Sequence, residues 1–173
     1  QLTSDAPVSA VRRSVRMARE RMRQTLASCL PVDLSGQRIL DAGCGTGANL
    51  PFLQHYGVAF GIDYFWRGLE FGRSRDFPRL LQGTVTHLPF ANASIDVVLS
   101  FDVLYCLDDE SEAGAIGEMW RILKPGGLVL VNVAALDVLQ GSHSTLTQEI
   151  RRYTPTRLRA RLERVGFHIE RLT

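Results

Sequence analysis

A glycine-rich segment, DAGCGTG at residues 41–47, directly follows a short run of strand-forming residues at 38–41. Gly43, Gly45 and Gly47 allow the tight turns and the close backbone approach that a ligand-binding loop needs. A helix that begins just after such a loop presents free N–H groups to the ligand. A strand, a glycine loop and a helix in this order predict the first unit of an α/β domain.

Strand and helix patterns alternate along the rest of the chain. Strands are expected at 38–41, 58–63, 79–82, 95–101, 128–135 and 167–172. Helices are expected at 11–30, from Leu50 up to Gly57, at 64–75, from an N-cap at Asp109 with Glu112 at N3 up to 124–127, and from Thr154 to Gly166. Alternation of this kind requires crossover connections and predicts a doubly wound, mostly parallel α/β sheet with helices on both faces.

The size of the chain sets the number of domains. With 173 residues, 45% of them hydrophobic, the chain can bury one good core and is too short for two ordinary domains. A single domain over 1–173 is therefore expected, in which 8–30 forms a leading amphipathic helix. No run approaches the roughly 18 apolar residues of a membrane-spanning helix, and no secretory signal is recognisable.

The cysteines indicate the compartment of the protein, and the arginines limit the kinds of partner it can bind. Cys29, Cys44 and Cys106 are scattered, which fits neither a disulfide framework nor a metal site and indicates a reducing cytoplasm.

Of the 20 basic residues, 13 lie in 1–23 and 151–173. Clustered Arg can attract phosphates or an anionic membrane surface, so contact of these ends with a membrane stays open, although a solvated helix face is the commoner explanation. No nucleic-acid-binding motif is present, which disfavours nucleic acid as a partner.

The glycine loop alone fits two kinds of ligand. Gly43, Gly45 and Ala48 also satisfy the GxGxxA form of the dinucleotide fingerprint, and Asp63 lies 20 residues after Gly43. Asp41 distinguishes a dinucleotide from a cationic ligand. A carboxylate at the end of the first strand repels a pyrophosphate and attracts a cation. S-adenosylmethionine (SAM) carries a sulfonium and an ammonium, so a negative site favours it.

Four motifs in order resemble those of the class I SAM-dependent methyltransferases. DAGCGTG is similar to motif I of that family, and GID at 61–63 is similar to the acidic residue after its second strand. LPFANASIDVVLSFDVLYCL at 88–107 resembles the region of the fourth strand, and RILKPGG at 121–127 resembles the turn before the fifth. The similarity spans about 36–173, and four ordered motifs are more specific than any one of them.

The resemblance implies a set of SAM-binding residues. In this set Asp63 accepts hydrogen bonds from both ribose hydroxyls, Tyr64 lies against the adenine, and Phe101 lines the methyl-transfer cavity. The remaining members surround the methionine part or lie near the adenine: Asp41, Gly43, Cys44, Gly45, Gly47, Thr84 and Val85. No metal is implied.

Two departures from the family pattern concern the adenine and the acceptor. Many relatives have Asp after the Gly that follows the third strand, whereas this chain has Thr84. Recognition of the adenine amino group then passes to the Thr84 hydroxyl or to backbone carbonyls. Relatives often have a His where this chain has Cys106, which indicates a different acceptor or a mechanism without that His.

Methyl transfer to a hydroxyl needs a group that takes its proton. The candidates are Asp102, Tyr105, His143 and Tyr153. Three of them have another explanation: Asp102 as a cap of the next turn, Tyr105 as packing under the sheet, and His143 as part of a loop.

The sequence therefore predicts a SAM-dependent methyltransferase that acts on a small-molecule acceptor, with O-methylation favoured over N- or C-methylation. Three alternatives remain: a nicotinamide-dependent oxidoreductase, a non-catalytic SAM-binding protein and an RNA methyltransferase. The oligomeric state is not indicated. The family fold adds a seventh, antiparallel strand between the fifth and sixth, so the natural protein is expected to continue beyond Thr173 and the fifth strand to have a bare or neighbour-covered edge.

Overall fold

The computed structural model describes residues 36–77, 79–133 and 150–172, together with the single positions 20, 24, 27 and 28. The chain divides into two compact units, Gln1–Leu34 and Ser35–Thr173. In the first unit the four described residues are helical and exposed, and the rest of the expected leading helix lies outside the described residues. All elements discussed below belong to the second unit.

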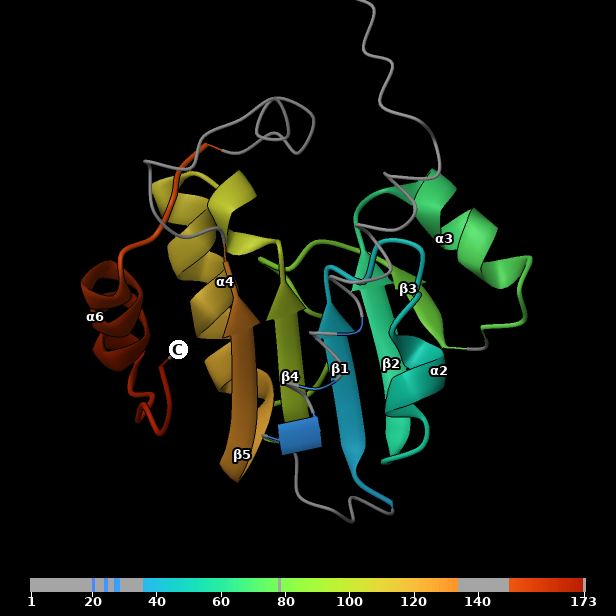
Figure 1. The fold of residues 1–173 in the computed structure, drawn as a ribbon, viewed down its shortest axis with the longest axis horizontal. Helices are drawn as coiled ribbons and strands as arrows, with labels where there is room; N and C mark the ends of the chain where they lie inside the picture. The colour runs from blue at the N-terminus through green and yellow to red at the C-terminus, as the bar shows by residue number, and fades with distance from the viewer. Residues whose placement is uncertain are drawn as a thin grey trace, which may run out of the picture. The chain divides into compact units, whose positions relative to one another are not determined.

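Five parallel strands form one sheet in the order β3-β2-β1-β4-β5. Figure 1 shows the sheet from β5 across to β3, flanked by helices. The strands are β1 (Arg38–Ala42), β2 (Val58–Asp63), β3 (Leu80–Gln82), β4 (Ile95–Phe101) and β5 (Leu123–Asn132). The expected doubly wound α/β sheet is confirmed, and β2 and β4 have the bounds that the sequence predicts.

The strand order reverses between β1 and β4, since the chain runs outward from β1 through β2 to β3 and then returns. In the register of the sheet Asp41 lies level with Gly61 on one side and with Leu99 on the other. The carboxyl ends of the central strands therefore lie at one edge of the sheet. In folds of this kind ligands bind at such a reversal.

Helices cover both faces of the sheet. They are α2 (Leu50–Leu53), α3 (Trp66–Arg73), the 3-10 turn η1 (Leu104–Cys106), α4 (Asp109–Ile122) and α6 (Pro155–Val165). Helices α2 and α3 contact β2, whereas α4 contacts β5 and α6. The ends of α6 follow the predicted signals: the Thr154 side chain accepts a hydrogen bond from Arg157 N at 3.2 Å, and Gly166 closes the helix at φ +116°.

The main core lies between the sheet and α4. Leu40, Ile62 and Val98 of the strands are fully buried in one cluster with Ile116 and Met119 of the helix. Burying an aliphatic side chain of this size stabilises the fold by about 1.5–3 kcal/mol. This cluster fixes the strand ends relative to α4, and therefore the site residues that follow the strands.

The start and the end of α4 differ from the prediction. The N-cap is Asp108 and not Asp109, because Asp108 Oδ1 accepts a hydrogen bond from Ser111 N at 2.7 Å. Asp109 and Glu112 bind arginines instead. The helix ends at Ile122, and β5 begins at Leu123, so that 124–127 belong to the strand rather than to a preceding turn.

The predicted sixth strand at 167–172 is wrong, since these residues form no strand. A strand exists only through backbone pairing, and within the described ranges β5 pairs with β4 alone and is the edge of the sheet. Phe167 packs instead edge-on against Trp120 of α4, with ring centroids 4.9 Å apart.

Candidate functional site

The glycine loop turns back over the end of β2. Gly43 N and Cys44 N both donate hydrogen bonds to Ile62 O, at 2.8 and 3.0 Å. Gly43 has φ +88°, and a Cβ there would lie 2.1 Å from Val103 Cγ2, so no other residue fits. A Cβ at Gly45 would meet no heavy atom of the described residues within 4 Å. Among these residues the loop is therefore closely packed at Gly43 and open at Gly45.

Helix α3 lies directly against the loop through two further glycines. A Cβ at Gly72 would lie 2.5 Å from Thr46 O, and one at Gly68 would lie 3.1 Å from Gly45 O. Neither residue is among the site residues expected from the sequence. Their spacing of four, which places both on one face of a helix, was the available signal.

Asp63, at the end of β2, binds the loop with its side chain. Asp63 Oδ2 accepts a hydrogen bond from Gly45 N at 2.7 Å, and Oδ1 accepts one from Phe65 N at 2.8 Å. The N-cap of α3 is Phe65, so Asp63 is not the cap of this helix. Each carboxylate oxygen can accept a second hydrogen bond, which suits a pair of neighbouring hydroxyls.

Asp41, at the end of β1, is a buried carboxylate close to Asp63. Only 1% of its surface is exposed, and its Oδ2 accepts a hydrogen bond from Asn49 Nδ2 at 3.1 Å. Burial raises the pKa of Asp41 to about 7, opposed by the Asn49 hydrogen bond and reinforced by the negative charge of Asp63. Within the described ranges Asp41 has no basic partner. A cation placed here would therefore be strongly favoured.

Cys44 fills the space between the loop and β2. Its Sγ would lie 2.8 Å from a Cβ at Gly61, and its contact with Gly45 O, at 3.9 Å, is a weak hydrogen bond. Burial raises the pKa of the Cys44 thiol, and the charges of Asp41 and Asp63 raise it further. The thiol is a packing group in this arrangement.

The residues expected near the adenine follow β2 and β3. The Tyr64 side chain is 81% exposed, and Val85 is buried. Thr84 Oγ1 lies 2.9 Å from Thr86 Oγ1 and accepts a hydrogen bond from Thr86 N at 3.3 Å. Gly83 N donates to Asp63 O at 3.0 Å, which joins this segment to the end of β2.

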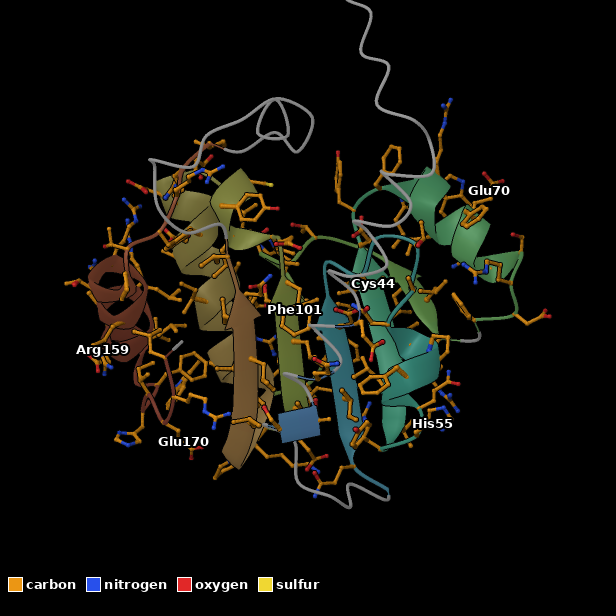
Figure 2. The ribbon with its side chains drawn as sticks, in the orientation of Figure 1. Cys44, His55, Glu70, Phe101, Arg159 and Glu170 are labelled. Atoms are coloured by element: carbon orange, nitrogen blue, oxygen red, sulfur yellow. The ribbon has the colours of Figure 1, made fainter. Side chains whose placement is uncertain are left out.

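Phe101 is the last residue of β4, and Asp102 follows it at the same edge of the sheet. Figure 2 labels Phe101 on β4 and Cys44 on the loop after β1. Asp102 has φ +60°, its N donates to Asn132 O at 3.0 Å, and its Oδ1 accepts from Asn132 Nδ2 at 3.2 Å. Val103 and not Asp102 precedes the 3-10 turn, so Asp102 does not cap it. Its carboxylate is exposed at the end of the strand.

Two tyrosines named as proton-transfer candidates are buried. The Tyr153 hydroxyl donates a hydrogen bond to Glu112 Oε1, and burial together with this carboxylate raises the pKa of the phenol. Tyr105 belongs to the main core, and its carbonyl accepts a hydrogen bond from Ile150 N at 2.9 Å. His143 lies outside the described residues.

Within the described ranges no group of His, Cys, Asp and Glu is arranged to hold a metal ion. No helix in the same ranges is long and apolar enough to cross a bilayer.

Comparison with known proteins agrees with this geometry. The family model described as "Methyltransferase domain" matches residues 40–131, more than half of the 173. Malonyl-acyl-carrier-protein O-methyltransferase of Pectobacterium atrosepticum is 33% identical over 125 residues, 70% of this chain and 47% of that protein. Magnesium-protoporphyrin O-methyltransferase of Rhodobacter capsulatus is 39% identical over 85 residues, 49% of this chain and 38% of that protein. The chain thus spans about half the length of such relatives, or less.

A solved structure shows the same fold. Phosphoethanolamine N-methyltransferase 2 of Haemonchus contortus, in complex with S-adenosyl-L-methionine, matches with a TM-score of 0.73 at 20% identity, over 85% of this chain and 36% of that one. SAM is the methyl donor of the family whose model matches here, as the resemblance implied. On the family match and the arrangement of the glycine loop and Asp63, the chain belongs to the class I SAM-dependent methyltransferases.

Proposed function

We propose that this domain transfers a methyl group from SAM to a small-molecule acceptor, with an oxygen nucleophile favoured over nitrogen or carbon. The observation that carries the proposal is the Asp63 carboxylate, held against the glycine loop by Gly45 N at 2.7 Å with acceptor capacity to spare. The preference for oxygen draws on two relatives that are named as O-methyltransferases.

The side chains at this edge fit the parts of SAM. Asp63 suits the two ribose hydroxyls. A Cβ at Gly45 would have no described neighbour within 4 Å, which leaves room for a ligand to approach the loop backbone there. Asp41 is buried and supplies a negative charge for the α-ammonium. The exposed ring of Tyr64 offers a face for the adenine. Bound SAM supplies a methyl carbon that its sulfonium has already activated.

The protein's task is then mainly to position donor and acceptor in line. Asp41 and Asp63 follow one another at the ends of the paired strands β1 and β2, and their charges interact. Together they attract a cationic donor, and this attraction weakens once the sulfonium charge is lost in the product. The geometry thus favours entry of SAM and release of S-adenosylhomocysteine (SAH).

A hydroxyl acceptor also requires a proton acceptor. Among the candidates in the described ranges, the Tyr153 hydroxyl donates a hydrogen bond to Glu112, and Tyr105 is packed in the core. Asp102 is an exposed carboxylate just after β4, next to Phe101. We therefore assign proton acceptance to Asp102, whereas His143 stays a prediction from the sequence.

Ligand-dependent thermal unfolding tests the proposal. At a hundredfold excess over the dissociation constant, SAM or SAH is expected to stabilise the protein by about 2.7 kcal/mol. A rise in melting temperature with NAD and none with either SAM compound would reject it in favour of a nicotinamide-dependent enzyme. Transfer of a labelled methyl group to hydroxyl rather than amine compounds of matched size tests the acceptor atom.

A further inference from the structure

Glu118 and Arg121, one turn apart on α4, form an ion pair that faces the loop between β3 and β4. Arg121 Nε lies 2.6 Å from Glu118 Oε1, and Arg121 Nη2 lies 2.8 Å from Glu118 Oε2. The pair is bidentate, which fixes the plane of the guanidinium. Both side chains are at most one-third exposed, so the pair is more than a solvated surface contact.

The same two side chains also bind the backbone of that loop. Arg121 donates to Leu88 O at 3.0 Å and to Phe90 O at 2.8 Å, and also to Asn92 Oδ1 at 2.8 Å. Glu118 Oε2 accepts a hydrogen bond from Leu88 N at 2.6 Å. One ion pair therefore forms hydrogen bonds with backbone and side-chain groups of a loop that lies outside the sheet. A buried polar group that is left without a hydrogen bond costs about 1–3 kcal/mol.

The loop held in this way begins at the candidate cofactor site. Gly83 N is bound to Asp63 O, and His87 N donates to Thr84 O at 3.2 Å, which forms a turn. Val85 and Leu88 are both buried in the main core. The segment that carries Thr84 and Val85 thus has two attachments, the end of β2 and the Glu118–Arg121 pair on α4.

We infer that Glu118 and Arg121 are positioning residues for the adenine end of SAM, which they serve by fixing the 83–92 loop. The inference rests on the proposed function, because it concerns the same cofactor site. Without the pair the loop would sample more conformations, and binding would have to order it again, which lowers affinity. Lysine can replace Arg121 only in part, since it lacks the planar set of donors that reaches three acceptors and a carboxylate at once.

SAH affinity measured by titration calorimetry tests this inference. Arg121→Ala is expected to weaken SAH binding about tenfold, which is about 1.4 kcal/mol, and Arg121→Lys is expected to recover only part of the loss. A second ligand, S-inosylhomocysteine, carries oxygen in place of the adenine amino group. The ratio of SAH affinity to S-inosylhomocysteine affinity is expected to fall in Arg121→Ala, because a general loss of stability would not change this ratio.

Two control variants separate positioning from stability. Arg159→Ala removes an arginine that pairs with Glu163 on α6, at 3.1 Å, and is expected to leave SAH binding unchanged. Leu162→Ala removes a buried side chain of α6, which lowers stability and leaves the hydrogen bonds from the Glu118–Arg121 pair to the loop in place. Wild-type affinity and an unchanged ligand ratio in Arg121→Ala, with a lower melting temperature like that of Leu162→Ala, would overturn the inference. A wild-type protein that binds no SAH would instead reject the proposed function itself.

Discussion

The molecule buries two carboxylates in opposite ways. Glu112 of α4 is fully buried, and Arg151 Nη1 lies 2.9 Å and Arg161 Nε 3.3 Å from its Oε2, while the Tyr153 hydroxyl donates to its Oε1. Asp41 is equally buried, yet the hydrogen bond that its side chain accepts from a described residue comes from the neutral Asn49. The chain supplies cations for Glu112 and none, within the described ranges, for Asp41.

The difference in partners indicates a structural role for Glu112 and a ligand-binding role for Asp41. A buried charge that the chain itself neutralises joins two segments, here α4 and the segment from Arg151 to α6. A buried acid without a cation costs stability, and it becomes useful when a ligand brings the cation. Strongly perturbed acids in a cleft are for this reason candidates for functional sites. We therefore expect substitutions at Glu112 and at Asp41 to have opposite effects on stability and on binding.

The largest effect is expected at Glu112. Glu112→Gln leaves arginines without their buried partner and should lower the free energy of unfolding by about 3 kcal/mol, measured by urea denaturation. The SAH affinity of the folded fraction should stay near that of the wild type. A Glu112→Gln protein of wild-type stability would show that the α4–α6 contact does not depend on this charge.

Asp63→Ala is expected to have the largest effect on binding. Two hydrogen bonds from the ribose to a carboxylate are worth about 1.5–3 kcal/mol each, so SAH affinity should fall by about two orders of magnitude or more. The fold should persist. Its stability should fall modestly, because the substitution removes the hydrogen bonds that Asp63 accepts from Gly45 N and Phe65 N. Calorimetry would measure the SAH affinity, and circular dichroism would check the fold. A folded Asp63→Ala protein with an affinity within a factor of three of the wild type would contradict the assignment.

Asp41→Asn should change stability in a pH-dependent way. The folded pKa of about 7 lies above the ordinary 3.8, so between these values the unfolded chain loses a proton that the folded chain keeps. Stability from this group therefore falls as pH rises from about 4 to about 7. Relative to the wild type, Asp41→Asn should gain stability over that range, as seen in urea midpoints. Parallel pH curves for the two proteins would contradict this expectation.

Thr84→Asp should have the smallest effect. Position 84 is half-buried, and its hydroxyl already bonds within its own turn to Thr86. A carboxylate there should be tolerated and should hold or raise SAM affinity by a few-fold, because it can accept a hydrogen bond from the adenine amino group. A complex with residue 84 far from the adenine would reject this prediction.

What the sequence predicts well depends on short-range signals. The glycine loop, the bounds of β2 and β4, and the ends of α6 at Thr154 and Gly166 follow from local backbone chemistry. The N-cap of α4 was misplaced by one residue because Asp108 and Asp109 are adjacent and either suits a cap. Local signals therefore locate an element more reliably than its first residue.

What the sequence misses depends on distant partners. The 167–172 segment has strand-like composition, but a strand needs a neighbour, and β5 offers none to it within the described ranges. Glu118 and Arg121 have the spacing of an ordinary surface pair, and their role appears only with Leu88, some 30 positions earlier. Glu112 likewise pairs with Arg151, which is 39 positions away.

Proton release on SAH binding tests the central contrast most directly. If the ligand's ammonium ionises Asp41, calorimetry in buffers of different ionisation enthalpy should show release of up to one proton per SAH below pH 7, falling toward zero above pH 8. Asp41→Asn should release none from this position and should bind SAH about tenfold more weakly above pH 7. Equal proton release by Asp41→Asn and the wild type at pH 6 would show that Asp41 is not the partner of a cationic ligand.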